Sequence, residues 1–247
     1  MRLVSMATIL LLATLLLGAS PAPTRLSLKE VSAALAHAAP GVPADFSGRD
    51  LSYLDLSGLD FKQANLSGAN LFGADLTDAN LSGADLAGAD LDRTVIIRAN
   101  FARANLARAS LMAVVAYPGL DTTAGPAPSF VGADLSGARI VARLGHADLR
   151  GAVLTDARLG YSLRELRTNS FSDLSGAELS EAKLVRADLR RVRLAFAHLS
   201  HADLSGADLT RADLFHADLT GADLTGANLT DADIAETLLR PSVGTER

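Results

Sequence analysis

Cysteine and tryptophan are absent from this 247-residue chain, and aromatic residues make up only 4% of it. Without cysteine there is neither a disulfide framework nor a site for a lipid-anchored cysteine, so stability must come from packing. The sequence also lacks a glycine-rich phosphate loop between a strand and a helix, and an aromatic and basic pattern for nucleic acid. These absences disfavour the common nucleotide-binding and nucleic-acid-binding classes.

The one long apolar run lies at the start of the chain. Arg2 is followed by the run Leu3–Leu17 and then by small residues. This is the pattern of a secretion signal, and the run is shorter than the roughly 20 residues that span a membrane. We predict that residues 1–20 are a signal peptide cleaved near Ala19, and that the protein is exported to the periplasm or outside the cell. Two prolines just after the boundary leave a retained membrane anchor as the alternative.

Most of the remaining chain repeats with a period of five residues. From Ala64 it reads A-N-L-S-G, A-N-L-F-G, A-D-L-T-D, and from Ala202 it reads A-D-L-S-G, A-D-L-T-R, A-D-L-F-H. A short fixed period is typical of a solenoid, in which each unit packs on its neighbours. On an extended chain the Ala and Leu of each unit point to one side, and the Asp or Asn between them points away.

The two residues after each Leu predict a corner. They are small, polar or glycine, as in Ser67-Gly68, and glycine suits the second central position of a type II turn, where φ is positive. Each unit is therefore predicted to be a short strand and a bend, and successive coils to pair through a parallel backbone ladder. A central residue such as Leu209 should be buried, whereas Thr210 should point outward and tolerate substitution.

These A(D/N)LXX units resemble the pentapeptide-repeat family over roughly residues 44–240. The resemblance implies an all-β solenoid, a right-handed quadrilateral parallel β-helix with four five-residue faces in each coil. It implies no shared activity, because the family is diverse and includes cytoplasmic proteins that mimic DNA to bind gyrase.

Sequence signals at the ends and in the middle of the repeats predict one continuous solenoid. Ser27-Leu28-Lys29-Glu30 is a capping box that starts a helix, and this helix is expected to cap the first coil. The repeat frame slips by one residue before Leu144. The predicted organisation is a signal peptide at 1–20, a capping helix at 26–39, one β-helix at 44–240 with excursions at 117–129 and 160–172, and a tail at 241–247.

Charge is segregated along the repeats, and the formal net charge is −5. Four successive corners carry arginines that would form a ring around one coil, namely Arg93, Arg98, Arg103 and Arg108. A second basic band holds Arg186, Arg190, Arg191 and Arg193. Beyond it, outward carboxylates form a candidate acidic binding surface of Asp203, Asp208, Asp213, Asp218 and Asp223. The alternative is a solvated face whose carboxylates bond to turn backbone and keep the rod soluble.

Twenty-residue stacking also predicts an apolar surface patch. Val95 and Ile97 occupy outward positions, and Val115 and Tyr117 follow in the same columns directly before the first excursion. Contiguous exposed apolar surface marks an interaction site, but we expect the excursion to fold back and cover this patch.

Catalytic and metal signals are weak. Ser180 and Lys183 match the S-x-x-K motif, but its companion motifs are missing and the repeat generates such matches by itself. His198 is stacked between Glu178 and Asp218, which predicts a surface ion column, because a zinc site needs three or four converging ligands. We therefore predict no catalytic residue, no metal and no cofactor.

The sequence favours an exported, non-enzymatic structural or protein-interaction scaffold that binds another envelope or extracellular protein. No small-molecule substrate or nucleic-acid partner is expected, and membrane contact only if the leader is retained. The alternatives are a DNA-mimicking inhibitor of a topoisomerase-type enzyme, which the leader disfavours, and an enzyme with its site on the excursions. At the C-terminal end Leu238 and Leu239 are expected to fold across the last coil, giving a monomer, with a C-terminal homodimer as the alternative.

Overall fold

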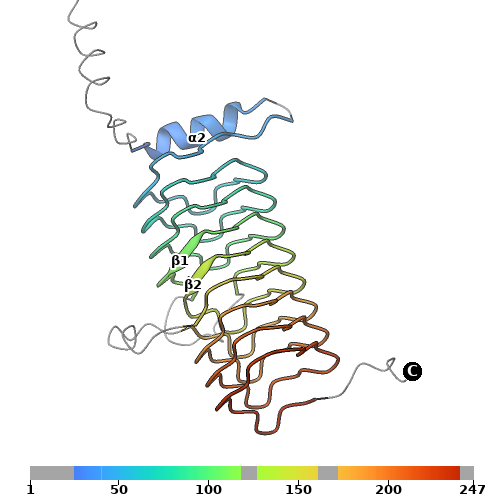
Figure 1. Cartoon of the computed structure of the whole chain (residues 1–247). Coiled ribbons are helices and arrows are strands. Elements are labelled where there is room, and N and C mark those ends of the chain that lie inside the picture. The colour runs from blue at the N-terminus through green and yellow to red at the C-terminus, as the bar shows by residue number, and fades with distance from the viewer. Residues whose placement is uncertain (1–24, 40, 118–126, 161–171, 240–247) are drawn as a thin grey trace, which may run out of the picture.

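The computed structural model describes residues 25–39, 41–117, 127–160 and 172–239. Its regular elements are the helix α2 (Leu28–His37) and two short strands, β1 (Ser110–Met112) and β2 (Arg139–Val141). The rest of the described chain winds into stacked coils held by single-residue parallel bridges (Figure 1). The predicted signal peptide, the tail and most of both excursions lie outside the described residues.

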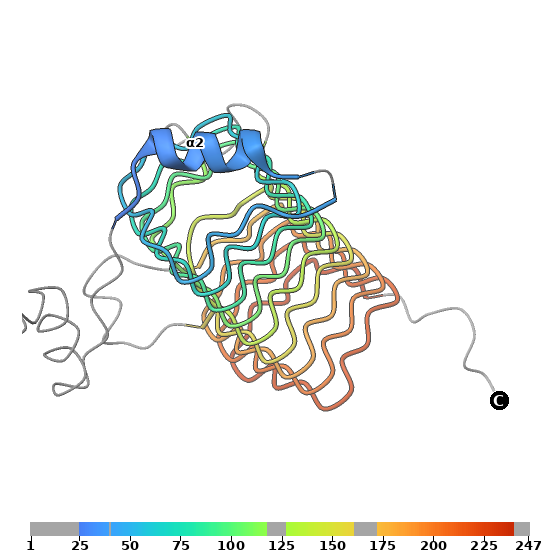
Figure 2. The same ribbon diagram turned by 90° about the horizontal axis from the view of Figure 1, so that it is seen from above.

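The coils pair at the twenty-residue spacing that the repeat predicts. In the first coil Asp45, Asp50, Asp55 and Asp60 each form a parallel bridge with the residue twenty positions later. We call the four stacks of outward residues that start at these aspartates the first, second, third and fourth columns. Four bridges per coil give the four-sided outline that is visible along the axis in Figure 2.

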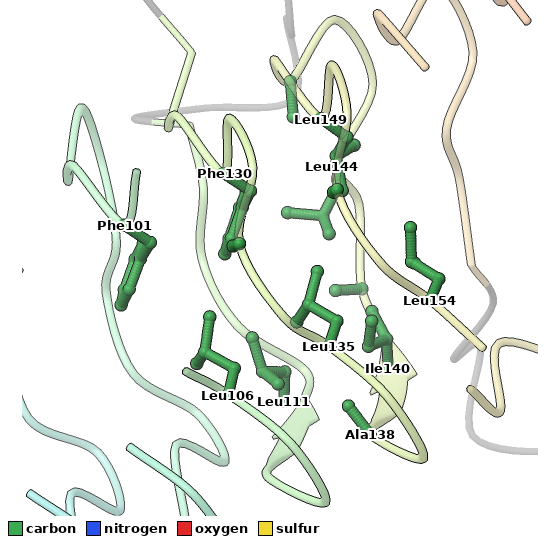
Figure 3. Packing of buried hydrophobic residues seen from close by; sticks show 14 of the residues in the cluster. Phe101, Leu106, Leu111, Phe130, Leu135, Ala138, Ile140, Leu144, Leu149 and Leu154 are labelled. Carbon is green, nitrogen blue, oxygen red and sulfur yellow. The ribbon is translucent and has the colours of Figure 1, made fainter. Parts of the chain in front are cut away.

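The interior contains the leucine and alanine of each unit. Leu106, Leu111 and Leu135 are 0%, 0% and 1% exposed, and Ala138 is fully buried beside them (Figure 3). Phe101 and Phe130 take the central position in neighbouring coils and stack with ring centroids 5.0 Å apart. Since each central side chain meets the central side chains of the coils above and below, the core is one continuous apolar column.

Each corner is a tight turn whose second position has a left-handed backbone. Gly68 has φ of 63°, and the amide of Ala69 donates to the carbonyl of Leu66 at 3.0 Å across the turn. The outward Asn65 supports the same turn, because its Oδ1 accepts the amide of Ser67 at 3.1 Å. Glycine is comfortable at this φ, whereas a residue with a Cβ is disfavoured there.

The four arginines of the predicted ring all occupy this second corner position, with φ between 56° and 60°. They follow one another around a single coil, which confirms the predicted arrangement: Arg93, Arg98, Arg103 and Arg108.

Three changes of spacing interrupt the ladder in the middle of the rod. Asn100 pairs with Ser129, Ser129 with Asp148, and Asp148 with Glu178. The first and third steps contain the excursions, and the second is one residue shorter than twenty, which confirms the predicted slip. Val141 occupies the shortened corner and is buried. Ser129 was predicted to belong to the excursion, but it lies in the fourth column because its bridges continue the ladder on both sides.

Helix α2 covers the N-terminal end of the rod, where it lies across the first coil (Figure 2). The capping box is confirmed, because the amide of Glu30 donates to Ser27 Oγ at 3.3 Å and the amide of Ser27 donates to Glu30 Oε2 at 2.8 Å. Val31 is fully buried and Leu35 packs on the core. The helix is shorter than the expected range of 26–39, since Ser27 is its N-cap and Ala38 already has ψ of 126°.

The opposite end is open among the described residues. The inward Leu219 is 3% exposed, but Ile234 and Leu239 in the last coil are 48% and 53% exposed. Leu238 bridges Asp218 and so extends the fourth column, and it too is 53% exposed. The expectation that Leu238 and Leu239 fold across the opening is wrong, because both residues simply continue the coil.

Candidate functional site

The candidate acidic surface lies on all four sides of the last coils, and its carboxylates are part of the corners. In every unit the Asp Oδ1 accepts the backbone amide two residues later, at distances of 2.9 to 3.1 Å. The residues are Asp203, Asp208, Asp213, Asp218 and Asp223. Each side chain therefore has a structural role, and only the part of the carboxylate that faces away from the turn is available to a partner.

Carboxylates also stack on carboxylates in this part of the rod. Near the N-terminal end an asparagine often alternates with an aspartate, and its Nδ2 donates to the preceding coil, as from Asn105 to Asp85 Oδ1 at 2.9 Å. Near the C-terminal end Asp203 pairs in register with Asp223, and Asp213 with Asp233. Like charges one coil apart repel each other. Asparagine supports the ladder without this repulsion, so the stacked negative charge at this end is not needed for the fold.

We expect the hydrogen bond that Asp203 accepts from the turn to stabilise the protein, and its negative charge to contribute little. Asp203→Asn keeps the Oδ1 acceptor for Ser205 and removes one of the two stacked charges, so stability should change by less than about 0.5 kcal/mol. Asp203→Ala leaves the turn amide without its acceptor and should destabilise the protein by about 1 kcal/mol. Thermal melting of both variants measures the difference, and equal losses would show that the bond does not support the corner.

The carboxylates also predict acid sensitivity. Hydrogen bonds from Thr220 hold the pKa of Asp218 below its ordinary value, and Thr225 does the same to the pKa of Asp223. A lowered folded-state pKa contributes stability that is present above the unfolded pKa of about 3.9 and is lost as the pH falls through the folded value. The melting temperature should therefore stay level between about pH 7 and 5 and fall below about pH 4. A decrease that is already complete at pH 5 would contradict this assignment.

Several basic groups form ion pairs within the rod. Arg98 binds Asp78 one coil away, and Arg186 binds Asp156 with Nη2 and Oδ2 2.7 Å apart. Arg190 forms an ion pair of 2.7 Å with Asp188. Exposed pairs of this kind contribute little stability.

The residues that match catalytic or metal-binding motifs belong to the repeat ladder, and Lys183 lies in the first column between Val153 and Asp203. His198 lies in the fourth column between Glu178 and Asp218, as predicted, and its Nε2 is 4.0 Å from Glu178 Oε1. Ser180 accepts a hydrogen bond from Ser200 Oγ at 3.0 Å. Within the described ranges, no group of three or more histidine, aspartate or glutamate side chains is placed to hold a metal ion.

The apolar patch is only partly as predicted. Val95 and Val115 bridge each other in the third column, and Val115 is 43% exposed. Tyr117 was expected to point outward, but it is 5% exposed and its hydroxyl donates to the carbonyl of Gly145. Burial, with the nearby charge of Asp173, raises the pKa of Tyr117 to about 12. The residue therefore anchors the start of the first excursion in the core.

A cavity of about 260 Å³ lies between the C-terminal end of α2 and the first coil. Its polar residues are Asp60, Lys62 and Gln63, beside the apolar Leu35 and Val42. Asp60 Oδ1 already accepts the amide of Lys62 and the Nδ2 group of Asn80. Oδ1 of this carboxylate therefore supports the corner and the neighbouring coil.

The model of the family described as pentapeptide repeats matches the chain in eight copies, over residues 44–78, 74–112, 172–211 and 207–240. These segments make up more than half of the sequence. The chain belongs to the pentapeptide-repeat family. No curated protein matches it.

Two solved structures are similar to this chain. HetL of the cyanobacterium Nostoc, a pentapeptide-repeat protein involved in heterocyst differentiation regulation, is 32% identical, with 80% of this chain and 83% of HetL covered and a TM-score of 0.51. QnrB1, a plasmid-mediated fluoroquinolone resistance protein, is 17% identical, with 79% of this chain and 88% of QnrB1 covered and a TM-score of 0.47.

Two aromatic clusters on the surface of this pentapeptide-repeat rod escaped the sequence analysis. Tyr53 packs edge-on against Phe72 in the next coil, with ring centroids 5.4 Å apart. Phe196 meets Phe215 at 5.7 Å in the same manner. Their spacing of nineteen residues is a signal that the twenty-residue stacking rule could have found. Within the described ranges, no helix is long and apolar enough to cross a membrane.

Proposed function

We propose that the protein is an exported, non-enzymatic scaffold, a right-handed β-helix whose outer surface binds another envelope or extracellular protein. The parallel ladder carries this proposal, because it holds outward side chains at a fixed spacing along four faces. The apolar leader of the sequence supports export, and a rigid rod with a continuous core supports a role in display or binding.

Export is tested by expressing the full chain in a bacterial host and separating the periplasm from the cytoplasm. We expect a soluble periplasmic product whose intact mass corresponds to cleavage near Ala19. The matched control is Leu11→Arg with Leu12→Arg, which interrupts the apolar run and should retain the uncleaved chain in the cytoplasm. An uncleaved native chain in the cytoplasm or the membrane fraction would refute this part of the proposal.

The second candidate is a DNA-mimicking inhibitor of a topoisomerase-type enzyme, which the stacked carboxylates favour. Basic residues and a histidine weaken the resemblance to DNA. In three of the four columns the residue one coil before the candidate aspartate is Lys183, Arg193 or His198. We therefore expect no inhibition of gyrase supercoiling by the mature chain. Inhibition that is lost in a variant with all five candidate aspartates changed to asparagine would support this second candidate instead.

A further inference from the structure

A bulky aromatic residue occupies a corner position where the fold favours glycine. Phe196 has φ of 60°, in the left-handed region that large side chains avoid. The same corner one coil earlier carries Gly176, with φ of 64°. Phe196 is nevertheless 55% exposed, so its ring adds little to the core. Exposed aromatic residues that lie together on a surface mark an interaction site.

Neighbouring rings hold Phe196 in a fixed arrangement. His216 lies one coil further on and stacks on Phe196, with centroids 5.1 Å apart and an interplanar angle of 15°. Phe215 meets both rings edge-on, with centroids 5.7 Å from Phe196 and 4.2 Å from His216. We call these three residues the aromatic corner. Its rings are preorganised, so a partner would lose little side-chain entropy by binding them.

Carboxylates border the aromatic corner on its C-terminal side. Glu236 Oε2 is 3.2 Å from His216 Nε2. Asp213 precedes the corner in the third column, and its Oδ1 accepts the amide of Phe215. Asp233 follows Asp213 in register one coil later. The rings therefore lie beside three acidic side chains, on the part of the rod where like charges already stack.

The chain itself shows which group such rings attract. At the other aromatic cluster the guanidinium carbon of Arg93 lies 5.6 Å from the centroid of Phe72, and that of Arg25 lies 5.9 Å from the centroid of Tyr53. Those cations belong to the rod. At the aromatic corner the charged neighbours on the C-terminal side are carboxylates instead, and Phe196 is 55% exposed.

We propose that the aromatic corner is a docking site for a lysine- or arginine-rich segment of a partner protein. The ring of Phe196 would bind a cationic side chain through its face, and Asp213, Asp233 and Glu236 would bind further cations and exclude acidic partners. This inference rests on the proposed scaffold function and names the chemistry of its partner.

The test uses the mature protein and two synthetic peptides of equal length, one rich in lysine and one in which every lysine is glutamate. We expect the lysine peptide to bind in titration calorimetry and the glutamate peptide not to bind. Phe196→Gly should weaken lysine-peptide binding at least tenfold without lowering the melting temperature, because glycine suits the left-handed corner. Tyr53→Gly is the matched control, since it removes a ring that is also more than half exposed from a corner with arginine neighbours and should leave binding unchanged.

Glu236→Gln completes the series. It should weaken binding a few-fold and reduce the dependence of binding on salt, because one of the attracting charges is lost. Equal binding of both peptides, or equal losses from Phe196→Gly and Tyr53→Gly, would overturn the inference. A failed peptide test would rule out this docking site but not export or partner binding by another face. Retention of the chain in the cytoplasm, in the fractionation experiment, would instead rule out the proposed scaffold function itself.

Discussion

Leu106→Asp is expected to lower the melting temperature by at least about 10 °C or to prevent folding. Leu106 is fully buried and lies beside Leu111 in the apolar column (Figure 3). The change removes a buried leucine, which alone costs about 2–5 kcal/mol, and adds a carboxylate without a partner. In a chain of this size each kcal/mol corresponds to about 2–4 °C. Circular dichroism during heating measures the effect.

The adjacent Ala107→Asp is the matched control. Ala107 occupies the first position of a corner and is partly exposed. The variant reproduces the Leu-Asp-Arg corner that the chain already has at Leu91-Asp92-Arg93, so its melting temperature should change by no more than about 2 °C. Thr210, which the sequence analysis expected to tolerate substitution, is less suitable because its hydroxyl donates to Asp208 Oδ1 and accepts from Asn228. Equal effects of the two variants would show that the inward and outward positions are misassigned.

The second large effect concerns the open C-terminal end, where we expect two copies to meet. Ile234 and Leu239 are about half exposed among the described residues, and a solenoid end with uncovered apolar side chains and strand edges favours association. Light scattering should give twice the monomer mass. Asp223, Asp231 and Glu236 surround this end, so the dimer should be stronger at about 0.5 M salt than at low salt.

Ile234→Lys should convert this dimer to a monomer, because it places a charge in the contact. Ala235→Lys adds the same charge at an exposed corner of the same coil and should leave the dimer intact. This expectation replaces the self-capped monomer predicted from the sequence. A native chain that is monomeric at every salt concentration would show that no second copy covers the end.

The five-residue period carries enough information to predict the coil, its four faces and its buried positions. Leu and Ala pack inward in every unit, and the outward Asp or Asn bonds to the turn. Because each residue type has the same role throughout, the repeated sequence is compatible with one packing arrangement. The capping box at Ser27 and the slip before Leu144 could be predicted because each follows from local spacing. The same period predicted that the acidic side chains would bond to the turns, which Asp203 and its equivalents do.

Positions where the repeat breaks could not be predicted in the same way. Tyr117 lies where the frame ends, and there its ring is buried and its hydroxyl donates to the carbonyl of Gly145. The aromatic corner was missed for a different reason, since Phe196, Phe215 and His216 are contiguous only after coils are stacked. Leu239 keeps its inward position without a further coil to cover it, and a sequence pattern does not show whether such an end is closed.

The scaffold function is tested most directly by site-specific crosslinking in cells that export the protein. A photoreactive amino acid is placed, one position at a time, at an exposed corner on each edge of the rod, replacing Tyr53, Gln63, Arg108 or Ala235, which lies on the edge that carries Phe196. The account predicts a discrete crosslinked product with one partner protein from the edge that carries Phe196. An exported, folded rod that yields no crosslinked product from any of the four edges would contradict it.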